Sequence, residues 1–166
     1  LSEFDDDMID EIKERFFREA ESAGLLTHPN IVTIFDAGEE HDLAYIAMEF
    51  LEGGDLEDFI KKEGYLPPLR DTLSMISNVA AALDYAHSKN IVHRDVKTAN
   101  IIVDDKGHVT IVDFGLTKDI ASDARLTSAG IVVETVQYMS PEQAEGKNVD
   151  GRSDLYSLGI TMFEML

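Results

Sequence analysis

The stretch from His93 to Gly115 constrains the fold of this chain more than any other part of it. It reads H-R-D-V-K-T-A-N, followed by a short apolar run, a turn, a second apolar run and D-F-G. Short apolar runs bounded by turn residues predict strands, so the polar residues around them lie on loops at strand ends. Those polar residues are two acids, a cation and an amide: Asp95, Asp113, Lys97 and Asn100.

These four side chains suit phosphoryl transfer, which depends mainly on charge neutralisation and in-line positioning. Mg²⁺ prefers hard oxygen ligands and keeps several waters, so Asn100 and Asp113 could supply the protein's share of a metal site. Asp95 could accept the proton of an incoming hydroxyl, and Lys97 could offset charge on the transferred group. A lone D-F-G is ordinary turn chemistry, and only the combination at fixed offsets is specific.

Two further phrases extend this pattern: H-P-N-I-V at 28–32 and Y-M-S-P-E-Q at 138–143. With them, the chain resembles the catalytic domain of a eukaryotic-like (Hanks-type) serine/threonine protein kinase of the bacterial branch, from helix C to helix F. The resemblance implies an α+β, protein-kinase-like fold. Residues 1–50 would form a partial small lobe with helix C and two strands, and residues 51–166 an incomplete, mainly helical large lobe.

The function that the resemblance implies is transfer of the γ-phosphoryl group of ATP to serine or threonine hydroxyls of a protein substrate. ATP and Mg²⁺ are the implied cofactors. By the resemblance, Asp95 is the base, and Asn100 and Asp113 hold Mg²⁺. Lys97 stabilises charge on the transferred phosphoryl group and favours serine/threonine over tyrosine as acceptor.

The composition argues against several other classes of function. The 166 residues include 33 Asp and Glu against 14 Lys and Arg, a net charge of −19, and no cysteine. Binding of nucleic acid or of an anionic membrane surface needs basic patches, which this balance disfavours. No apolar run approaches the ~20 residues of a membrane span. We therefore expect a cytoplasmic segment without membrane contact of its own, which leaves open an anchor elsewhere in the full-length protein.

The first predicted element is a helix from Met8 to Ala23, because its apolar residues recur at helical spacing and Gly24 follows. By the resemblance, Glu19 matches the helix-C glutamate that pairs with a strand lysine; the alternative is a plain surface acid. The lysine before it is Lys13, and helix positions six apart do not face each other. No glycine-rich loop precedes the helix either, so we interpret the sequence as a partial kinase domain.

Two apolar runs, Ile31–Ala37 and Leu43–Phe50, flank a polar G-E-E-H-D and predict a hairpin. By the resemblance, the hinge that follows binds adenine through its backbone at Glu49 and Leu51. Met48 would be the gatekeeper just before it, and simple core filling is the other interpretation of this methionine.

Two more residues are candidates for nucleotide contact. Asp55 follows Gly53-Gly54, where it is a natural helix N-cap; by the resemblance it could also meet the ribose. Ile102 would touch the adenine ring from below.

Pro67-Pro68 begins a long helix that ends near Lys89-Asn90. Its expected buried seam has spacings of three and four: Leu69, Leu73, Ile76, Ala80, Leu83 and His87. We interpret His87 as a packed histidine and not as a ligand.

A strand at Ile91–Val92 is expected to lead from this helix into the catalytic loop. Beyond the loop, Ile101–Val103 and Val109–Val112 flank D-D-K-G-H and predict a second hairpin. This hairpin would bring Asp113 back to Asn100.

The resemblance also assigns supporting residues. His93 would pack beneath Phe114, and Arg94 would pair with a phosphorylated residue of the activation segment at 116–142. Thr127 and Ser128 are the candidates for that phosphorylation; the alternative is that exposed loops simply favour Ser and Thr.

Later positions are assigned in the same way. Thr135 matches the threonine that bonds the catalytic Asp and Lys, and Glu134 stands where many relatives have glycine. Glu142 belongs to S-P-E, a variant of A-P-E whose usual arginine partner is missing. Asp154 would hold the backbone of the H-R-D loop from a helix at Arg152–Leu166. The expected apolar face of that helix comprises Leu155, Leu158, Gly159, Met162 and Phe163.

Two alternatives to an active protein kinase remain. One is a truncated chain or pseudokinase that acts, if at all, as a non-catalytic interaction module. The missing lysine and glycine-rich loop favour it, whereas the intact polar residues of the catalytic loop argue against it. The other is a small-molecule kinase on a related fold, which would be expected to lack a long segment ending in S-P-E.

Overall fold

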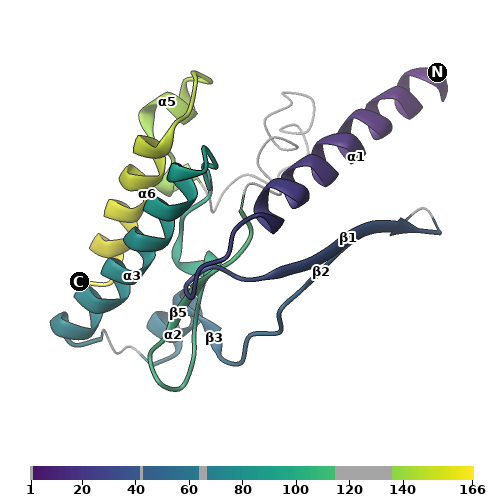
Figure 1. Ribbon diagram of the computed structural model, residues 1–166. Helices are drawn as coiled ribbons and strands as arrows, with labels where there is room; N and C mark the ends of the chain where they lie inside the picture. Colours follow the sequence, from purple (N-terminus) through teal and green to yellow (C-terminus); the bar gives the residue numbers. More distant parts are fainter. Residues whose placement is uncertain (1, 42, 64–66, 115–135) are drawn as a thin grey trace.

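Two small antiparallel sheets, one of two strands and one of three, organise the chain together with the helices that pack on them (Figure 1). The computed structural model describes residues 2–41, 43–63, 67–114 and 136–166. The elements in chain order are α1 (Ser2–Gly24), β1 (Ile34–Glu40), β2 (Leu43–Met48), β3 (Gly54–Asp55), α2 (Leu56–Glu63), α3 (Leu69–Ser88), the 3₁₀ helix η1 (Thr98–Asn100), β4 (Ile101–Val103), β5 (Val109–Ile111), the 3₁₀ helix η3 (Val136–Tyr138), α5 (Pro141–Ala144) and α6 (Gly151–Glu164).

The first sheet is the predicted hairpin of β1 and β2, with Ala37 opposite Ile46. Its first strand begins at Ile34 and not at Ile31. Helix α1 lies beside it and begins at Ser2, earlier than the predicted Met8. The Lys13 ammonium bonds the Glu39 carboxylate at 2.5 Å, so this lysine ties the helix to the hairpin.

The second sheet has the order β3-β4-β5, and its strand β3 was not predicted. Gly54 and Asp55, for which the sequence indicated only the start of a helix, pair with β4, with Asp55 opposite Ile102. The carboxylate of Asp55 accepts the N–H of Asp58 at 2.6 Å, which confirms Asp55 as the N-cap of α2. The predicted hairpin of β4 and β5 is also confirmed, with Ile102 opposite Thr110.

The connection from α1 to β1 joins this second sheet through backbone hydrogen bonds. The N–H of Val32 donates to the Ile111 carbonyl at 3.0 Å, and the N–H of Ile111 donates to the Asn30 carbonyl at 2.9 Å. The Asn30 side-chain amide adds a bond of 2.7 Å to the Val109 carbonyl. Residues 30–32 therefore fix α1 and the hairpin against β5.

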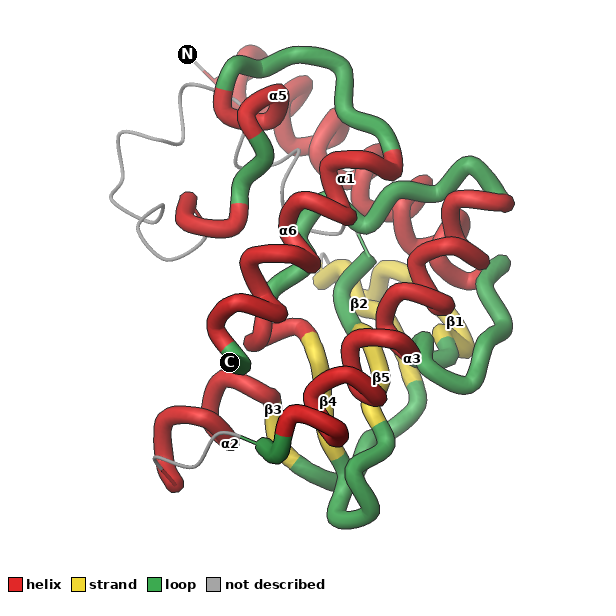
Figure 2. The backbone as a smooth tube through the Cα atoms, turned by 90° about the vertical axis from the view of Figure 1, so that its left-hand side faces the viewer, coloured by secondary structure: helices red, strands yellow, loops and turns green. Residues whose placement is uncertain are grey.

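Helices α3 and α6 lie side by side, and α3 also contacts β5 (Figure 2). One hydrophobic core runs through α1, α3, the strands and α6. Its fully buried members include Val79, Leu83, Ile101, Ile111 and Met165. No helix in the described ranges has the length and apolar character that a membrane crossing requires.

The buried seam predicted for α3 is wrong at its start and holds in part beyond it, because Leu83 is buried and Ile76 and Ala80 are partly buried against the core. The buried residues are Thr72, Met75, Val79, Ala82, Leu83 and Ala86. Leu69 and Leu73 from the predicted seam are 61 % and 47 % exposed. Two neighbouring stripes of this helix fit the same spacing of three and four, and the contacts with β5 and α6 decide which one is covered.

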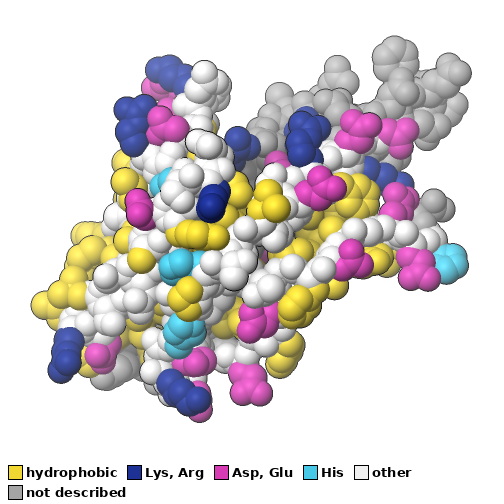
Figure 3. All heavy atoms as spheres, viewed as in Figure 1, with side chains coloured by type: hydrophobic (Ala, Val, Ile, Leu, Met, Phe, Trp, Pro, Cys, Tyr) yellow, Lys and Arg dark blue, Asp and Glu magenta, His cyan; other side chains and the backbone are white. Residues whose placement is uncertain are grey.

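The face predicted for α6 is wrong except at Leu158, which is buried. Its buried residues are Ser153, Asp154, Ser157, Leu158 and Thr161. Leu155 and Phe163 are 54 % and 80 % exposed, and exposed apolar side chains gather over the α3 and α6 side of the molecule (Figure 3). The buried hydroxyls are satisfied, because Ser157 donates to the Tyr138 carbonyl at 2.7 Å and Thr161 to the Ser157 carbonyl at 3.0 Å.

The predicted strand at Ile91–Val92 is absent from the described structure. The N–H of Ile91 instead donates to the Ala86 carbonyl at 3.0 Å, which closes the end of α3. Within the described residues neither of the two pairs with a strand, and they form an irregular connection into the catalytic loop.

Gly53 offers a test of this fold, with its neighbour as a control. Its φ is +127°, and a Cβ there would lie 2.2 Å from the Val103 carbonyl oxygen, whereas a Cβ at Gly54 would meet nothing within 4 Å. We expect Gly53→Ala to lower the free energy of unfolding by about 2 kcal/mol or more, because the backbone strain at positive φ and the steric overlap with the Val103 carbonyl add. Gly54→Ala should change it by well under about 1 kcal/mol. Urea unfolding of both variants measures this, and equal stabilities would contradict the β3–β4 pairing.

Candidate active site

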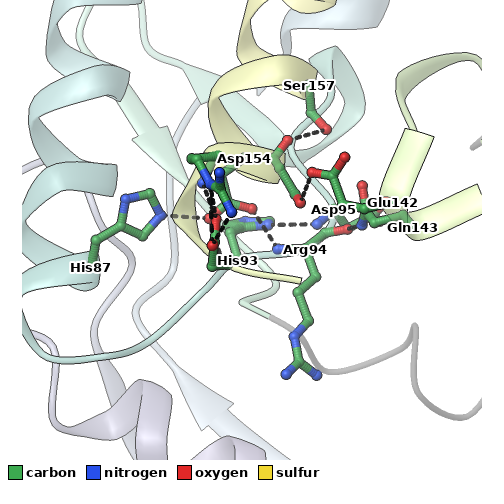
Figure 4. Close-up of polar contacts among 11 residues, drawn as sticks. His87, His93, Arg94, Asp95, Glu142, Gln143, Asp154 and Ser157 are labelled. Carbon is green, nitrogen blue, oxygen red and sulfur yellow. Dashed lines mark hydrogen bonds and ion pairs between the residues drawn. The ribbon is translucent and has the colours of Figure 1, made fainter. Parts of the chain in front are cut away.

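One buried carboxylate holds the first residues of the catalytic loop. Asp154 is 1 % exposed, and its two oxygens accept the backbone N–H groups of His93 at 2.8 Å and Arg94 at 2.7 Å (Figure 4). Arg94 has a φ of +68°, which is uncommon for a residue with a side chain. The geometry is the one that the resemblance assigned to Asp154, since the carboxylate holds the loop in a conformation that the backbone alone disfavours.

His87 is a member of this arrangement that sequence reasoning missed. Its Nε2 lies 2.7 Å from Oδ2 of Asp154, so it reaches the same carboxylate from α3 (Figure 4). Gly151 leaves space for the ring, because a Cβ at that position would lie 2.6 Å from Nδ1 of His87. A contact between positions this far apart in the chain leaves no periodic signal, so the single sequence could not have revealed it.

His93 is fully buried and uses both ring nitrogens. Nε2 lies 2.9 Å from the Val112 carbonyl, which can only accept, and Nδ1 lies 3.2 Å from the Asp95 N–H, which can only donate. This arrangement requires a neutral imidazole. Burial lowers the pKa of His93 below its ordinary value, although nearby Asp154 opposes that shift. The ring also packs on Phe114, with centroids 4.5 Å apart, as the resemblance expected.

Asp95, Lys97 and Asn100 form a cluster of direct contacts within the loop. The Lys97 ammonium lies 3.3 Å from Oδ2 of Asp95. The Asn100 amide donates to the Asp95 carbonyl at 2.8 Å and to Oδ2 at 3.0 Å. Because the amide nitrogen of Asn100 is directed at Asp95, its oxygen is the end left to accept or to coordinate.

Backbone hydrogen bonds join this loop to the strand end that carries Asp113. The N–H of Val112 donates to the Asn100 carbonyl at 3.0 Å, and the Val112 carbonyl receives the His93 ring. Asp113 follows immediately, with a φ of +61°. The described residues contain no group of three or more His, Cys, Asp and Glu side chains suited to a metal. Asn100 and Asp113 together offer one amide oxygen and one carboxylate, a donor set that fits Mg²⁺.

A hollow of about 520 Å³ lies beside the connection at 49–52. Glu49, Leu51 and Ile102, three of the residues expected to contact adenine, line it. Its other walls come from the α1–β1 connection and the β4–β5 turn, and the acids of the catalytic loop and D-F-G are not among its lining residues.

The two remaining nucleotide candidates lie outside that hollow. Met48 ends β2 and is 37 % exposed, so its interpretation as a core residue is wrong. Asp55 uses one carboxylate oxygen to cap α2.

Side-chain hydrogen bonds connect the S-P-E region to the catalytic loop and to α6. Ser140 and Gln143 form a capping box at α5, and the Gln143 side-chain amide donates to the Arg94 carbonyl at 2.8 Å. The hydroxyl of Ser153 donates to the Glu142 carboxylate, which lowers the pKa of Glu142. Ser153 on α6 is thus a partner of Glu142 that the sequence did not indicate.

The other predicted regulatory residues divide between described and undescribed parts. Glu19 lies on α1 and is partly buried. Thr127, Ser128 and Thr135 lie outside the described residues.

Replacing the anchoring carboxylate tests its role. We expect Asp154→Asn to lower the free energy of unfolding by about 2 kcal/mol, because an amide NH₂ would face a backbone N–H that now has a charged acceptor. Asp105→Asn, on the exposed β4–β5 turn, is the control. Chemical denaturation provides the comparison, and an Asp154→Asn chain as stable as the control would refute the assignment.

The neutral His93 predicts a pH dependence of stability. Its pKa in the folded chain lies below the ordinary 6.5, so the unfolded chain binds more protons as pH falls below that value and stability decreases. We expect His93→Phe to reduce the slope of unfolding free energy between about pH 7.5 and about pH 5.5, by up to ~1.4 kcal/mol per pH unit. His41→Asn is a matched control, since His41 is exposed and has a φ of +52° that Asn tolerates. Urea titrations at several pH values measure the slope, and an unchanged slope in His93→Phe would contradict the neutral imidazole.

Comparison with known proteins gives one consistent result. The protein kinase domain family model matches residues 3–166. The chain is 42 % identical over 156 residues to the serine/threonine-protein kinase PknB of Mycobacterium leprae (strain TN), a match that covers 92 % of this chain and 25 % of that protein. It is 44 % identical over 156 residues to the serine/threonine-protein kinase PrkC of Bacillus subtilis (strain 168), covering 94 % and 24 %.

Structural comparison agrees with the sequence matches. The chain is similar to the crystal structure of the kinase domain of Mycobacterium tuberculosis PknI, with a TM-score of 0.75 and 32 % identity over 94 % of this chain and 57 % of that one. The chain spans about a quarter of the length of the curated relatives it matches. The protein-kinase-like fold expected from the sequence is thereby confirmed, and the chain belongs to the protein kinase domain family, of the Hanks type found in bacterial serine/threonine kinases.

Proposed function

We propose that this chain carries the catalytic loop of a serine/threonine protein kinase that transfers the γ-phosphoryl group of ATP to a protein hydroxyl. The observation that supports it is the contact cluster of Asp95, Lys97 and Asn100, held beside the strand end of Asp113. The relatives named above are serine/threonine-protein kinases, which favours a protein acceptor over a small molecule.

In this proposal Asp95 orients the acceptor hydroxyl and receives its proton. The Asn100 amide bonds Oδ2 of Asp95 and so sets the direction of the carboxylate. Lys97 is close to the same oxygen, yet its side chain is 20 % exposed, so its ammonium can also reach a phosphoryl group brought to the loop.

Asn100 and Asp113 are the proposed Mg²⁺ ligands. The amide oxygen of Asn100 is turned away from Asp95, and Asp113 follows the residue whose backbone bonds Asn100. When bound, the ion neutralises charge on the phosphates of the nucleotide.

The nucleotide base is assigned to the connection after β2. We propose that Met48, Glu49 and Leu51 border the adenine, with Ile102 beneath it. The N–H of Glu49 already donates to the Thr33 carbonyl at 2.8 Å, so this residue offers its carbonyl. Asp55 could meet the ribose only through the oxygen that does not cap α2.

The regulatory assignments are proposals of the same kind. Arg94 would receive a phosphate from Thr127 or Ser128, Thr135 would bond the catalytic Asp and Lys, and Glu19 would pair with a strand lysine. The division into lobes near residue 50 also belongs to this proposal.

A non-catalytic interaction module is the second candidate function. The observation in its favour is that the hollow beside residues 49–52 has no lining residue from the catalytic loop or from D-F-G. A chain that folds and binds partners without transferring phosphate would fit that arrangement.

Calorimetric titration of Mg²⁺-ATP into the 166-residue chain tests the nucleotide site. We expect binding that Asp113→Asn weakens at least about tenfold, because a carboxylate ligand is lost. Asp84→Asn, on the exposed face of α3, should leave the binding unchanged. A folded chain that does not bind Mg²⁺-ATP would favour the non-catalytic module.

Transfer itself is measured with radiolabelled ATP and a protein rich in serine and threonine. Asp95→Asn should keep Mg²⁺-ATP binding within about twofold and reduce transfer at least about 100-fold, since the amide cannot accept the proton. Equal transfer by Asp95→Asn and wild type would remove Asp95 from the mechanism.

A further inference from the structure

A polar cluster outside the assigned catalytic groups, with Thr98 and Tyr138 buried and Glu164 partly buried, joins three segments of the chain. It comprises Thr98 in η1, Tyr138 in η3 and Glu164 in the last turn of α6. The hydroxyls of Thr98 and Tyr138 are 3.1 Å apart. Both reach Oε2 of Glu164: Thr98 at 3.3 Å, and Tyr138 through a close hydrogen bond.

The direction of each hydrogen bond follows from the number of hydrogens. Tyr138 has one hydroxyl hydrogen and donates it to the Glu164 carboxylate, which can only accept. The Tyr138 oxygen is therefore an acceptor toward Thr98. Thr98 is therefore the donor in both of its contacts, and its one hydroxyl hydrogen is shared between the Tyr138 oxygen and the Glu164 carboxylate. Burial and the bond to Glu164 raise the pKa of Tyr138 to about 12, so this phenol stays protonated.

The position of Glu164 is unfavourable for helix stability alone. It is an acid in the last turn of α6, where the backbone carbonyls already concentrate negative charge. Two hydroxyl donors compensate that placement. The same face of α6 also holds Tyr138 by its backbone, because Ser157 donates to the Tyr138 carbonyl at 2.7 Å.

Thr98 lies between two of the residues that the proposed function requires. The 3₁₀ turn it begins is a single short turn, with the Asn100 N–H bonded to the Lys97 carbonyl at 3.0 Å. Such turns are weak by themselves. Thr98 is 0 % exposed, and its hydroxyl bonds Tyr138 and Glu164 on the inner side of this turn.

We propose that Thr98 is a positioning residue: its hydroxyl, donated to Tyr138 and Glu164, fixes the turn that presents Lys97 and Asn100. The inference deepens the proposed function and rests on it, since Lys97 and Asn100 matter for transfer only if that function holds. No feature of the periodicity or of the motif pointed to this residue.

Site-resolved amide hydrogen exchange of the folded chain tests the proposal without requiring activity. We expect Thr98→Val, which removes the hydroxyl at nearly constant volume, to speed exchange of the Asn100 amide at least about tenfold relative to the Val79 amide in α3. Thr98→Ser keeps the donor and should stay within about twofold of wild type. Thr72→Val is the matched control: Thr72 is also 0 % exposed, and its hydroxyl contacts the Pro67 carbonyl at the start of α3.

A second variant covers the case in which Thr98→Val does not fold. The double variant Tyr138→Phe with Glu164→Leu removes both acceptors of the Thr98 hydroxyl and should speed exchange of the Asn100 amide by a similar factor. The proposal is overturned if the Asn100 amide exchanges in Thr98→Val, or in this double variant, as it does in Thr72→Val. It is also overturned if Thr98→Ser behaves like Thr98→Val, because the effect would then come from packing.

Calorimetry and transfer assays on the same variants separate this inference from the proposed function. Where the wild-type chain transfers phosphate, Thr98→Val should lower the rate about tenfold and Thr98→Ser should restore it to within about twofold. A wild-type chain that does not bind Mg²⁺-ATP would refute the proposed function, and the exchange experiment would still decide whether Thr98 positions the turn.

Discussion

The geometry of the catalytic loop depends on the buried carboxylate of Asp154. This one group accepts the N–H of His93 and of Arg94, and it receives His87 from α3. The loop needs such an anchor because Arg94 occupies a conformation that is costly for a residue with a side chain. The neutral His93 ring, which follows this anchor, then bonds the Asp95 N–H with one nitrogen and the Val112 carbonyl with the other, and so fixes the next part of the loop.

Helix α6 acts as a polar scaffold more than as a hydrophobic core helix. Its inner side carries hydroxyls and two acids, and four of these side chains hold backbone or side-chain groups of the segments around it: Ser153, Asp154, Ser157 and Glu164. Loops present unpaired N–H and C=O groups, and a helix that packs against loops must supply partners for them. An apolar face in that place would leave buried polar groups unsatisfied.

Sequence reasoning was most informative where chemistry constrains neighbouring residues. The H-R-D and D-F-G phrases identified Asp95, Lys97, Asn100 and Asp113, and the structure brings the first three into contact and Asp113 to the adjoining strand end. It missed His87, Thr98 and Glu164. Each of these acts through a side-chain contact with a residue far away in the chain, and a single sequence holds no record of such pairs.

The sequence alone determined the helices α1, α2, α3 and α6, the two hairpins, the N-cap at Asp55 and the motif loops, because these depend on local spacing and turn chemistry. Tertiary structure decided which stripe of α3 and of α6 is buried, and that Gly54–Asp55 forms a strand. Neighbouring helical stripes share one period, and a strand of two residues exists only when a partner offers its edge. In both cases the deciding free energy belongs to the contact between elements and not to the element itself.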